Sequence, residues 1–273
     1  MQARTPLHSG MTAEEAFIVV ALDAADDFVT HLEATMKDDD PHGPHQARVA
    51  LRRLRTMLKA YEPILDRDFV DDLKDESRRL FLQLGHIRDA DIRLAAAETD
   101  AERSDRQKAA MEVRDSSRKK LSRDDADEFA DRLEARLEKK GWKADSKKAR
   151  TWRKSPIAVL ASNALDRAWD DIQPEEPLED MSDRTLHNLR KDVKAMRYMA
   201  EFFGPVMDRG DWRASLDGLK ALQDKLGELT DMALSGKQDN SSRPDLVRDA
   251  AGLVSRIISL GTWWRIDGDL AED

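Results

Sequence analysis

Hydrophobic residues recur along this chain at three- and four-residue spacings, which is the period of an amphipathic α-helix. Glycine and proline are scarce, and no stretch alternates apolar and polar residues as a half-buried strand does. The pattern therefore predicts an all-α fold. We expect the first helix over 13–36, after a capping box of Thr12 and Glu15, and a break over 38–44.

The same periodicity predicts the other helices of the first half. One is expected over 45–65 and a shorter one over 68–84, which ends near Gly85 as a cap glycine. Residues 100–150 are rich in charge, which predicts a long solvated helix pair or a partly mobile arm. The junction between two halves is expected over 147–156.

The second half begins at Ser155 and Pro156, a pair that favours a helix start. After a loop over 173–179, the expected helices cover 183–203, 212–227, 228–234 and 244–266. The predicted domain plan is an N-terminal tail (1–12), one domain (13–266) made of two helical bundles (13–148 and 155–266), and an acidic C-terminal tail (267–273).

A basic motif of the first half recurs in the second half, with 142 added to each residue number. A fixed offset over more than one element indicates an internal duplication. The matched positions are His45, Arg48, Arg52, Arg55, Gly85 and Asp89 with His187, Arg190, Lys194, Arg197, Gly227 and Asp231.

The basic motif lies on one face of each predicted helix. At 100° per residue, His45, Arg48, Arg52, Arg55 and Lys59 share an arc of about 80°, and apolar residues occupy the opposite arc. The second copy keeps this arrangement, except that Glu201 replaces the lysine. The second half is therefore the weaker source of positive charge.

Like charges three and four residues apart repel each other, so a helix optimised only for stability would place glutamates among them. Between Pro41 and Tyr61 there is none. We infer that a bound anion supplies the missing charge, since the arginine fork matches two phosphate oxygens and a protonated histidine adds a donor. A solvated basic face without a ligand is the alternative.

Composition limits the kind of anion and the location of the protein. The 273 residues contain 46 Lys and Arg against 55 Asp and Glu, and a net charge of -9 argues against a nucleic-acid or membrane binder. No cysteine is present, so disulfides and thiol chemistry are excluded. The longest apolar run, Ala16 to Leu22, is too short to span a bilayer. We expect a soluble cytoplasmic protein.

Three aspartates accompany the repeated glycines. Asp89, Asp91 and Asp231 are expected to accept hydrogen bonds from a helix N-terminus or an arginine. A metal site built on them is the alternative, although no further ligands lie at metal spacing. Two histidines in the stretch 41–45 are weak support for a metal tract. No metal, cofactor or catalytic residue is predicted.

Four stretches of the chain, 45–55, 84–89, 186–198 and 222–231, resemble the signature motifs of the CHAD family, the conserved histidine α-helical domain. The resemblance spans about residues 12–266. It implies two pseudo-symmetric four-helix bundles around a central basic cavity, and binding of inorganic polyphosphate, often at polyphosphate granules.

The resemblance also implies which residues line the cavity. Carried over position by position, they are His45, Arg48, Arg52, Arg55, His187, Arg190, Lys194 and Arg197, with Arg53, Lys59, Arg88, Lys191 and Lys220 as weaker candidates. The CYTH triphosphatase domain of some members has no counterpart here, since no segment is rich in predicted strands. We therefore expect a binding protein rather than an enzyme.

Two other functions are consistent with the residues. A phosphoryl-transfer or polyphosphate-hydrolysing enzyme would need carboxylates or a nucleophile beside the cations. An adaptor protein would recruit basic partners through its acidic surface. Polyphosphate is nevertheless the expected partner, because the basic arcs have almost no aromatic residues on which nucleic-acid bases could stack.

Overall fold

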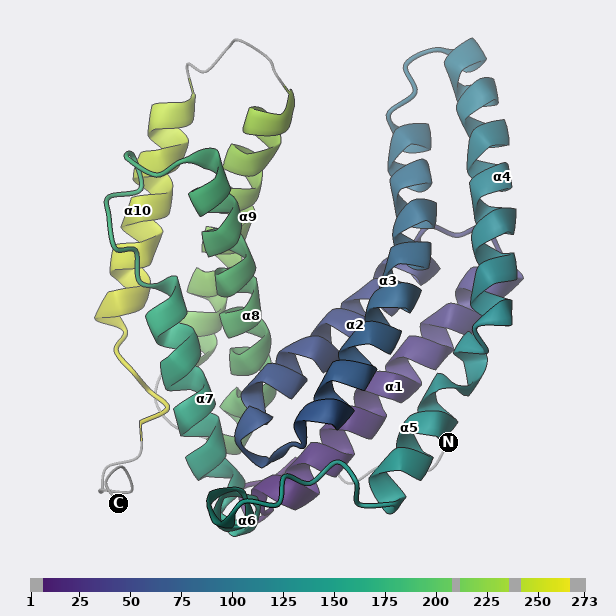
Figure 1. Ribbon diagram of the computed structural model, residues 1–273. Coiled ribbons are helices and arrows are strands. Elements are labelled where there is room, and N and C mark those ends of the chain that lie inside the picture. The colour runs from purple at the N-terminus through teal and green to yellow at the C-terminus, as the bar shows by residue number, and fades with distance from the viewer. Residues whose placement is uncertain (1–6, 208–211, 236–241, 266–273) are drawn as a thin grey trace. The chain divides into compact units, whose positions relative to one another are not determined.

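A computed structural model describes residues 7–207, 212–235 and 242–265, and in these residues it contains ten α-helices and no strand (Figure 1). The predicted all-α fold is confirmed. The chain divides into two compact units between Lys154 and Ser155. The first unit comprises residues 14–154, and the second comprises 7–13 and the chain from 155 onward.

The first unit contains six helices and two short 3-10 turns. They are α1 (Ala13–Lys37), α2 (His42–Ala60), the turn Glu62–Ile64, α3 (Arg67–Ala95), α4 (Asp100–Arg123), the turn Ala126–Glu128, α5 (Phe129–Glu138) and α6 (Lys147–Lys154). Aromatic rings form part of the core. The ring of Phe17 lies 5.3 Å from that of Tyr61 and 4.9 Å from that of Trp142.

Helix α2, which carries the first basic motif, begins three residues earlier than predicted and ends earlier too. The backbone N–H of His42 donates to the side chain of Asp40 at 2.9 Å, which fixes the start. Pro44 then falls in the first turn, where its missing N–H removes no helical hydrogen bond. The break is therefore confined to residues 38–41, and residues 62–64 form a separate 3-10 turn at Pro63.

The predicted helix end at Gly85 is wrong, because α3 continues without a break from Arg67 to Ala95. The predicted boundary at Gly227 is wrong for the same reason, since α9 is one helix from Trp212 to Ser235. A glycine inside a helix usually costs stability compared with alanine. Both glycines therefore have another role, which lies in their contacts with arginines of α2 and α8.

The charged segment after α3 forms helices. Helix α4 packs along α3 (Figure 1), and Asp91 and Arg114 form an ion pair between them at 2.7 Å with both side chains buried. An apolar stripe of α5, formed by Phe129, Leu133 and Leu137, is buried as well. Of the two predicted alternatives, the structure thus has the helical one.

The second unit contains α7 (Ile157–Ile172), α8 (Asp183–Met207), α9 (Trp212–Ser235) and α10 (Arg243–Ser259), and consecutive helices pack against each other. Helix α10 ends before the predicted 266, since Gly261 adopts a positive φ of 69°. Residue 266 and the predicted acidic tail lie outside the described residues, as do residues 1–6. No helix in the described ranges is long and apolar enough to cross a membrane.

Candidate anion-binding site

Arg48 is the central residue of the basic face of α2, and α3 holds its guanidinium in place. Its Nη1 donates to the carbonyl oxygen of Phe81 at 3.0 Å. Its Cζ lies 3.8 Å from the centre of the Phe81 ring, which is a cation–π contact. Arg52 lies farther out over the same ring, at 5.9 Å. One aromatic residue of α3 thus orients two cations of α2.

Gly85 provides the space into which the Arg48 side chain fits. A Cβ atom at position 85 would lie 2.2 Å from Nη1 of Arg48, closer than the atoms can approach. Gly85 therefore allows the guanidinium to lie directly against the backbone of α3. The sequence context of Gly85 predicts a helix cap, but the glycine instead permits the close approach of an arginine side chain.

The other cations of α2 line the same face with increasing exposure toward the end of the helix. The Nε atom of Arg52 is buried and makes no hydrogen bond with another described residue. Arg55 and Lys59 are exposed, and His45 is partly exposed at the opposite end. This face therefore presents guanidinium and ammonium donors beside an imidazole.

The pKa values of His45 and Arg48 are lowered because the face is partly buried and positively charged. Burial lowers the pKa of His45 most, followed by Arg88, Arg52, His42 and Arg48. Burial and then Arg52 lower the pKa of Arg48, and Asp89 partly offsets them. Arginine stays protonated at any physiological pH, so the direction of the shift reflects a charged group that is partly buried beside other cations, a situation that an anion would relieve.

The second unit repeats the contact between arginine and glycine at the matched positions. A Cβ atom at Gly227 of α9 would lie 3.1 Å from Nη2 of Arg190 of α8, and 3.4 Å from its Cζ and Nε. The Nε atom of Arg190 is buried and has no hydrogen-bond partner among the described residues. The duplication seen in the sequence is thus a duplicated contact between helices.

The charge of the second basic face is partly neutralised within the unit. Arg197 donates from Nε to Oε1 of Gln223 at 3.0 Å and from Nη1 to Oε1 of Glu201. Its Cζ also lies 4.4 Å from the ring centre of Tyr198. The prediction that the second half is the weaker source of cations agrees with these contacts.

The two predicted histidines lie at matching places, each one turn before the central arginine. His187 is partly buried, and its Nδ1 atom is buried without a hydrogen-bond partner in the described chain. In a neutral imidazole either ring nitrogen can carry the proton. An anion beside the arginine would offer the histidine an acceptor.

The weaker candidates occupy varied positions. Arg88 lies in α3, close enough to His45 to lower its pKa. Arg53 is about 140° from Arg48 around α2 and faces Asp27 of α1 at 3.9 Å, so it lies off the basic face. Lys191 donates to Asn188 at 3.4 Å, and Lys220 is an exposed residue of α9.

The predicted role of the aspartates as acceptors is met in part. Asp91 accepts from Nη2 of Arg114, and burial raises the pKa of Asp91 although Arg114 opposes the shift. Asp89 lies within α3 rather than at a helix start and acts on Arg48 through its charge. In the described residues no three His, Asp or Glu side chains are grouped to hold a metal ion.

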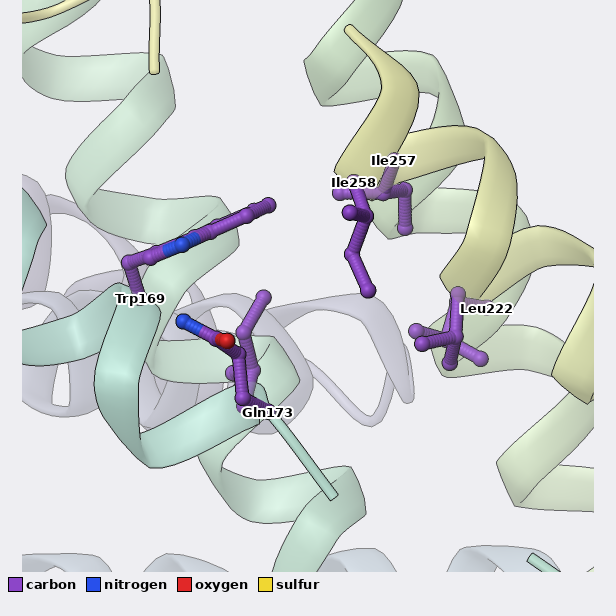
Figure 2. Close-up of a pocket in the computed structure, with 7 residues that line it drawn as sticks. Trp169, Gln173, Leu222, Ile257 and Ile258 are labelled. Atoms are coloured by element: carbon purple, nitrogen blue, oxygen red, sulfur yellow. The ribbon is translucent and has the colours of Figure 1, made fainter. Parts of the chain in front are cut away.

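A small pocket of the second unit has a different chemistry. It lies among α7, α9 and α10 with a volume of about 200 Å³, and Figure 2 shows Trp169 and Ile258 at its wall with the Gln173 amide beside them. Its lining is otherwise apolar. The residues are Trp169, Ile172, Gln173, Leu222, Val254, Ile257 and Ile258. The pocket offers no cation to an anionic ligand.

Phe81 is a site residue that the sequence-based prediction did not include. It lies one turn before Gly85, on the same face of α3, so helical spacing could have identified it. The signal was missed because phenylalanine is more often a core residue than a support for arginine.

Comparison with known proteins identifies the family and the fold of this chain. The CHAD domain family matches residues 20–237. The crystal structure of the CHAD domain from the plant Ricinus communis superposes with a TM-score of 0.68 at 22% identity, covering 96% of this chain and 92% of that one. PptA from Streptomyces chartreusis has a TM-score of 0.47 at 14% identity, covering 93% and 100%. No curated protein matches. From the family match and the shared fold, we conclude that this chain belongs to the CHAD domain family.

Proposed function

We propose that this protein binds inorganic polyphosphate through the basic faces of α2 and α8, without hydrolysing it. One observation carries the proposal: the central arginine of each face lies against a glycine at the matched position, and buried nitrogens of both faces lack partners. Such nitrogens cost free energy unless a ligand accepts their hydrogen bonds. The membership in the CHAD domain family supports the same ligand class.

The chemistry of the faces favours a polyphosphate over a nucleic acid. Single-stranded nucleic acids are usually held by aromatic rings on which bases stack. On the face of α2, the ring of Phe81 is already covered by Arg48 at 3.8 Å. On α8, the ring of Tyr198 is buried beneath Arg197. A chain of phosphates needs only the cations and has no bases to place.

Polyphosphate bound to folded protein should raise the melting temperature. At a concentration about 100 times the Kd, stabilisation is about 2.7 kcal/mol, which corresponds to a rise of roughly 5–10 °C. The expected rise, measured by thermal shift in low salt, should shrink as sodium chloride is added, because counterions compete. Orthophosphate at the same total phosphate is the control.

Hydrolysis is the alternative function, and the same protein tests it. Phosphate release from long-chain polyphosphate, measured with magnesium or manganese, is expected to stay at the level of the buffer. A melting temperature that does not respond to polyphosphate would contradict binding, whereas release above background would establish an enzyme. Convergence of both basic faces on one cavity, and association with polyphosphate granules in cells, stay predictions.

A further inference from the structure

Cations also follow the face of α3 that lies beside α2. With Gly85 set to zero on a helical wheel, Arg78 lies at about +20°, Lys74 at about -20°, Phe81 at about -40° and Arg88 at about -60°, so they share an arc of about 80° with Gly85. Phe81 and Gly85 both contact Arg48 of α2. This face of α3 is therefore turned toward the basic face of α2.

The cations on this face of α3 are not engaged in ion pairs with described residues. Lys74, Arg78 and Arg88 make no hydrogen bond or ion pair within the described part of the chain. Glu76, by contrast, lies on the far side of α3 and pairs with Arg132 and Arg136 of α5, at 2.9 and 3.2 Å. Glu76 thus compensates cations of α5 and not those of this face.

The two rows of cations run alongside each other. Helices α2 and α3 are joined by a short turn and pack together (Figure 1). Because the helices run in opposite directions and Arg48 contacts Phe81 and Gly85, Arg88 lies toward the His45 end of α2 and Lys74 toward the Lys59 end. Each row, from His45 to Lys59 and from Lys74 to Arg88, extends about 21 Å at 1.5 Å per residue.

We propose that α3 supplies a second row of anion-binding cations, formed by Lys74, Arg78 and Arg88, and that the ligand lies along the line where α2 and α3 meet. Cations then contact it from both sides. The inference rests on the proposed function and specifies its ligand as a linear polyanion that extends along both rows. A single phosphate or a pyrophosphate would reach only a fraction of these groups.

The second unit lacks most of this row. Adding 142 to the residue numbers places Lys220 at the position of Arg78, but Leu216 and Thr230 at those of Lys74 and Arg88. Of the three positions in this row, only the one occupied by Arg78 and Lys220 has a cation in both units.

Arg78→Glu tests the second row, with Arg79→Glu as the matched control. Both residues are exposed on α3 and the charge change is identical, but Arg79 lies about 100° away around the helix. We expect Arg78→Glu to weaken binding of long-chain polyphosphate about tenfold or more and to reduce the slope of log K against log salt by about one. Arg79→Glu should change the Kd by less than about twofold.

Helical content and the melting temperature of the free protein establish that both variants fold. Arg78→Ala is a milder second variant, for which we expect a smaller loss of affinity. Equal losses in Arg78→Glu and Arg79→Glu would overturn the second row. If Arg52→Glu lost affinity while both α3 variants kept it, the proposed function would stand and the second row would fall. Pyrophosphate that competed as well as long chains would overturn the extended ligand.

Discussion

The basic faces of α2 and α8 carry matched residues, yet they differ in how far their positive charge is paired within the same unit. Arg55 of α2 is exposed and makes no hydrogen bond or ion pair within the described chain. Its counterpart Arg197 bonds to Gln223 and to Glu201. Lys59 occupies the position of Glu201 in the first unit. One arginine is thus available to a ligand, while the other is engaged within its own unit.

Two substitutions account for most of this difference. Phe81 stands where Gln223 stands, and a phenyl ring can stack on a guanidinium but cannot accept its hydrogen bond. Glu201 adds a carboxylate one turn from Arg197, where it forms an ion pair. A duplicated scaffold can therefore keep its cations and still specialise one copy, through the residues that surround them.

The largest expected effect comes from reversing one matched charge in each face. Arg52→Glu combined with Lys194→Glu should abolish polyphosphate binding, because each change removes a donor and adds a negative charge that repels the phosphates. The measurement is a titration that gives a Kd for the wild-type protein. Circular dichroism should show the same helical content as the wild type, since both side chains lie outside the apolar core. Unchanged affinity in the double variant would refute the basic faces as the site.

The single variants show which face contributes more. We expect Arg52→Glu to cost about 1.5–3 kcal/mol, or roughly ten- to hundredfold in Kd, and Lys194→Glu to cost less. A larger loss for Lys194→Glu would reverse the proposed order of the two units.

Glu201→Lys should make the second face resemble the first. The change removes the carboxylate that pairs with Arg197 and adds a cation at the position of Lys59. We expect affinity for polyphosphate to rise by about five- to tenfold, with a steeper salt dependence. Isothermal titration at several salt concentrations measures both. Glu201→Gln is the control and should give a smaller gain, while an unchanged Kd in both would place Arg197 outside the site.

Filling the space at the glycines should affect the first unit more than the second. A methyl group at Gly85 would displace the Arg48 guanidinium, whereas at Gly227 it would be only slightly too close to Arg190. We expect Gly85→Ala to weaken binding about fivefold, the loss of part of one charged hydrogen bond, and Gly227→Ala about twofold. Alanine favours a helix, so the free proteins should stay near wild-type stability. If Gly85→Ala bound polyphosphate with the same Kd as the wild type, the contact between Gly85 and Arg48 would not be what orients the guanidinium for binding.

The smallest expected effect is a dependence on pH through His45. In the free protein the pKa of His45 is lowered by burial and by Arg88, Arg52, His42 and Arg48. A bound polyanion would raise this pKa, so binding takes up a proton and affinity increases as the pH falls. Between about pH 7.5 and 6 we expect a two- to threefold gain. His45→Gln should flatten the dependence, and the same slope in that variant would assign it to another group.

The sequence by itself determined the helical class, the duplication and the cationic arcs. A period near 3.6 residues is a local property of the chain, and so is the placement of His45, Arg48, Arg52 and Arg55 on one face. The family motifs could be identified in the same way. Both helix ends predicted at Gly85 and Gly227 failed, because a glycine signals a cap only when nothing else requires its missing side chain.

Only the tertiary structure decided what those glycines and cations contact. Gly85 lies inside a continuous helix, and the guanidinium of Arg48 occupies the space that a side chain at position 85 would fill. Because the two residues are far apart in the sequence, helical periodicity alone could not predict this contact. The phenyl ring that orients Arg48, the glutamine that binds Arg197 and the second row on α3 likewise depend on which faces of two helices meet. Helix periodicity defines each face, but packing selects its partner, and the partner determines whether a charge is neutralised or left for a ligand.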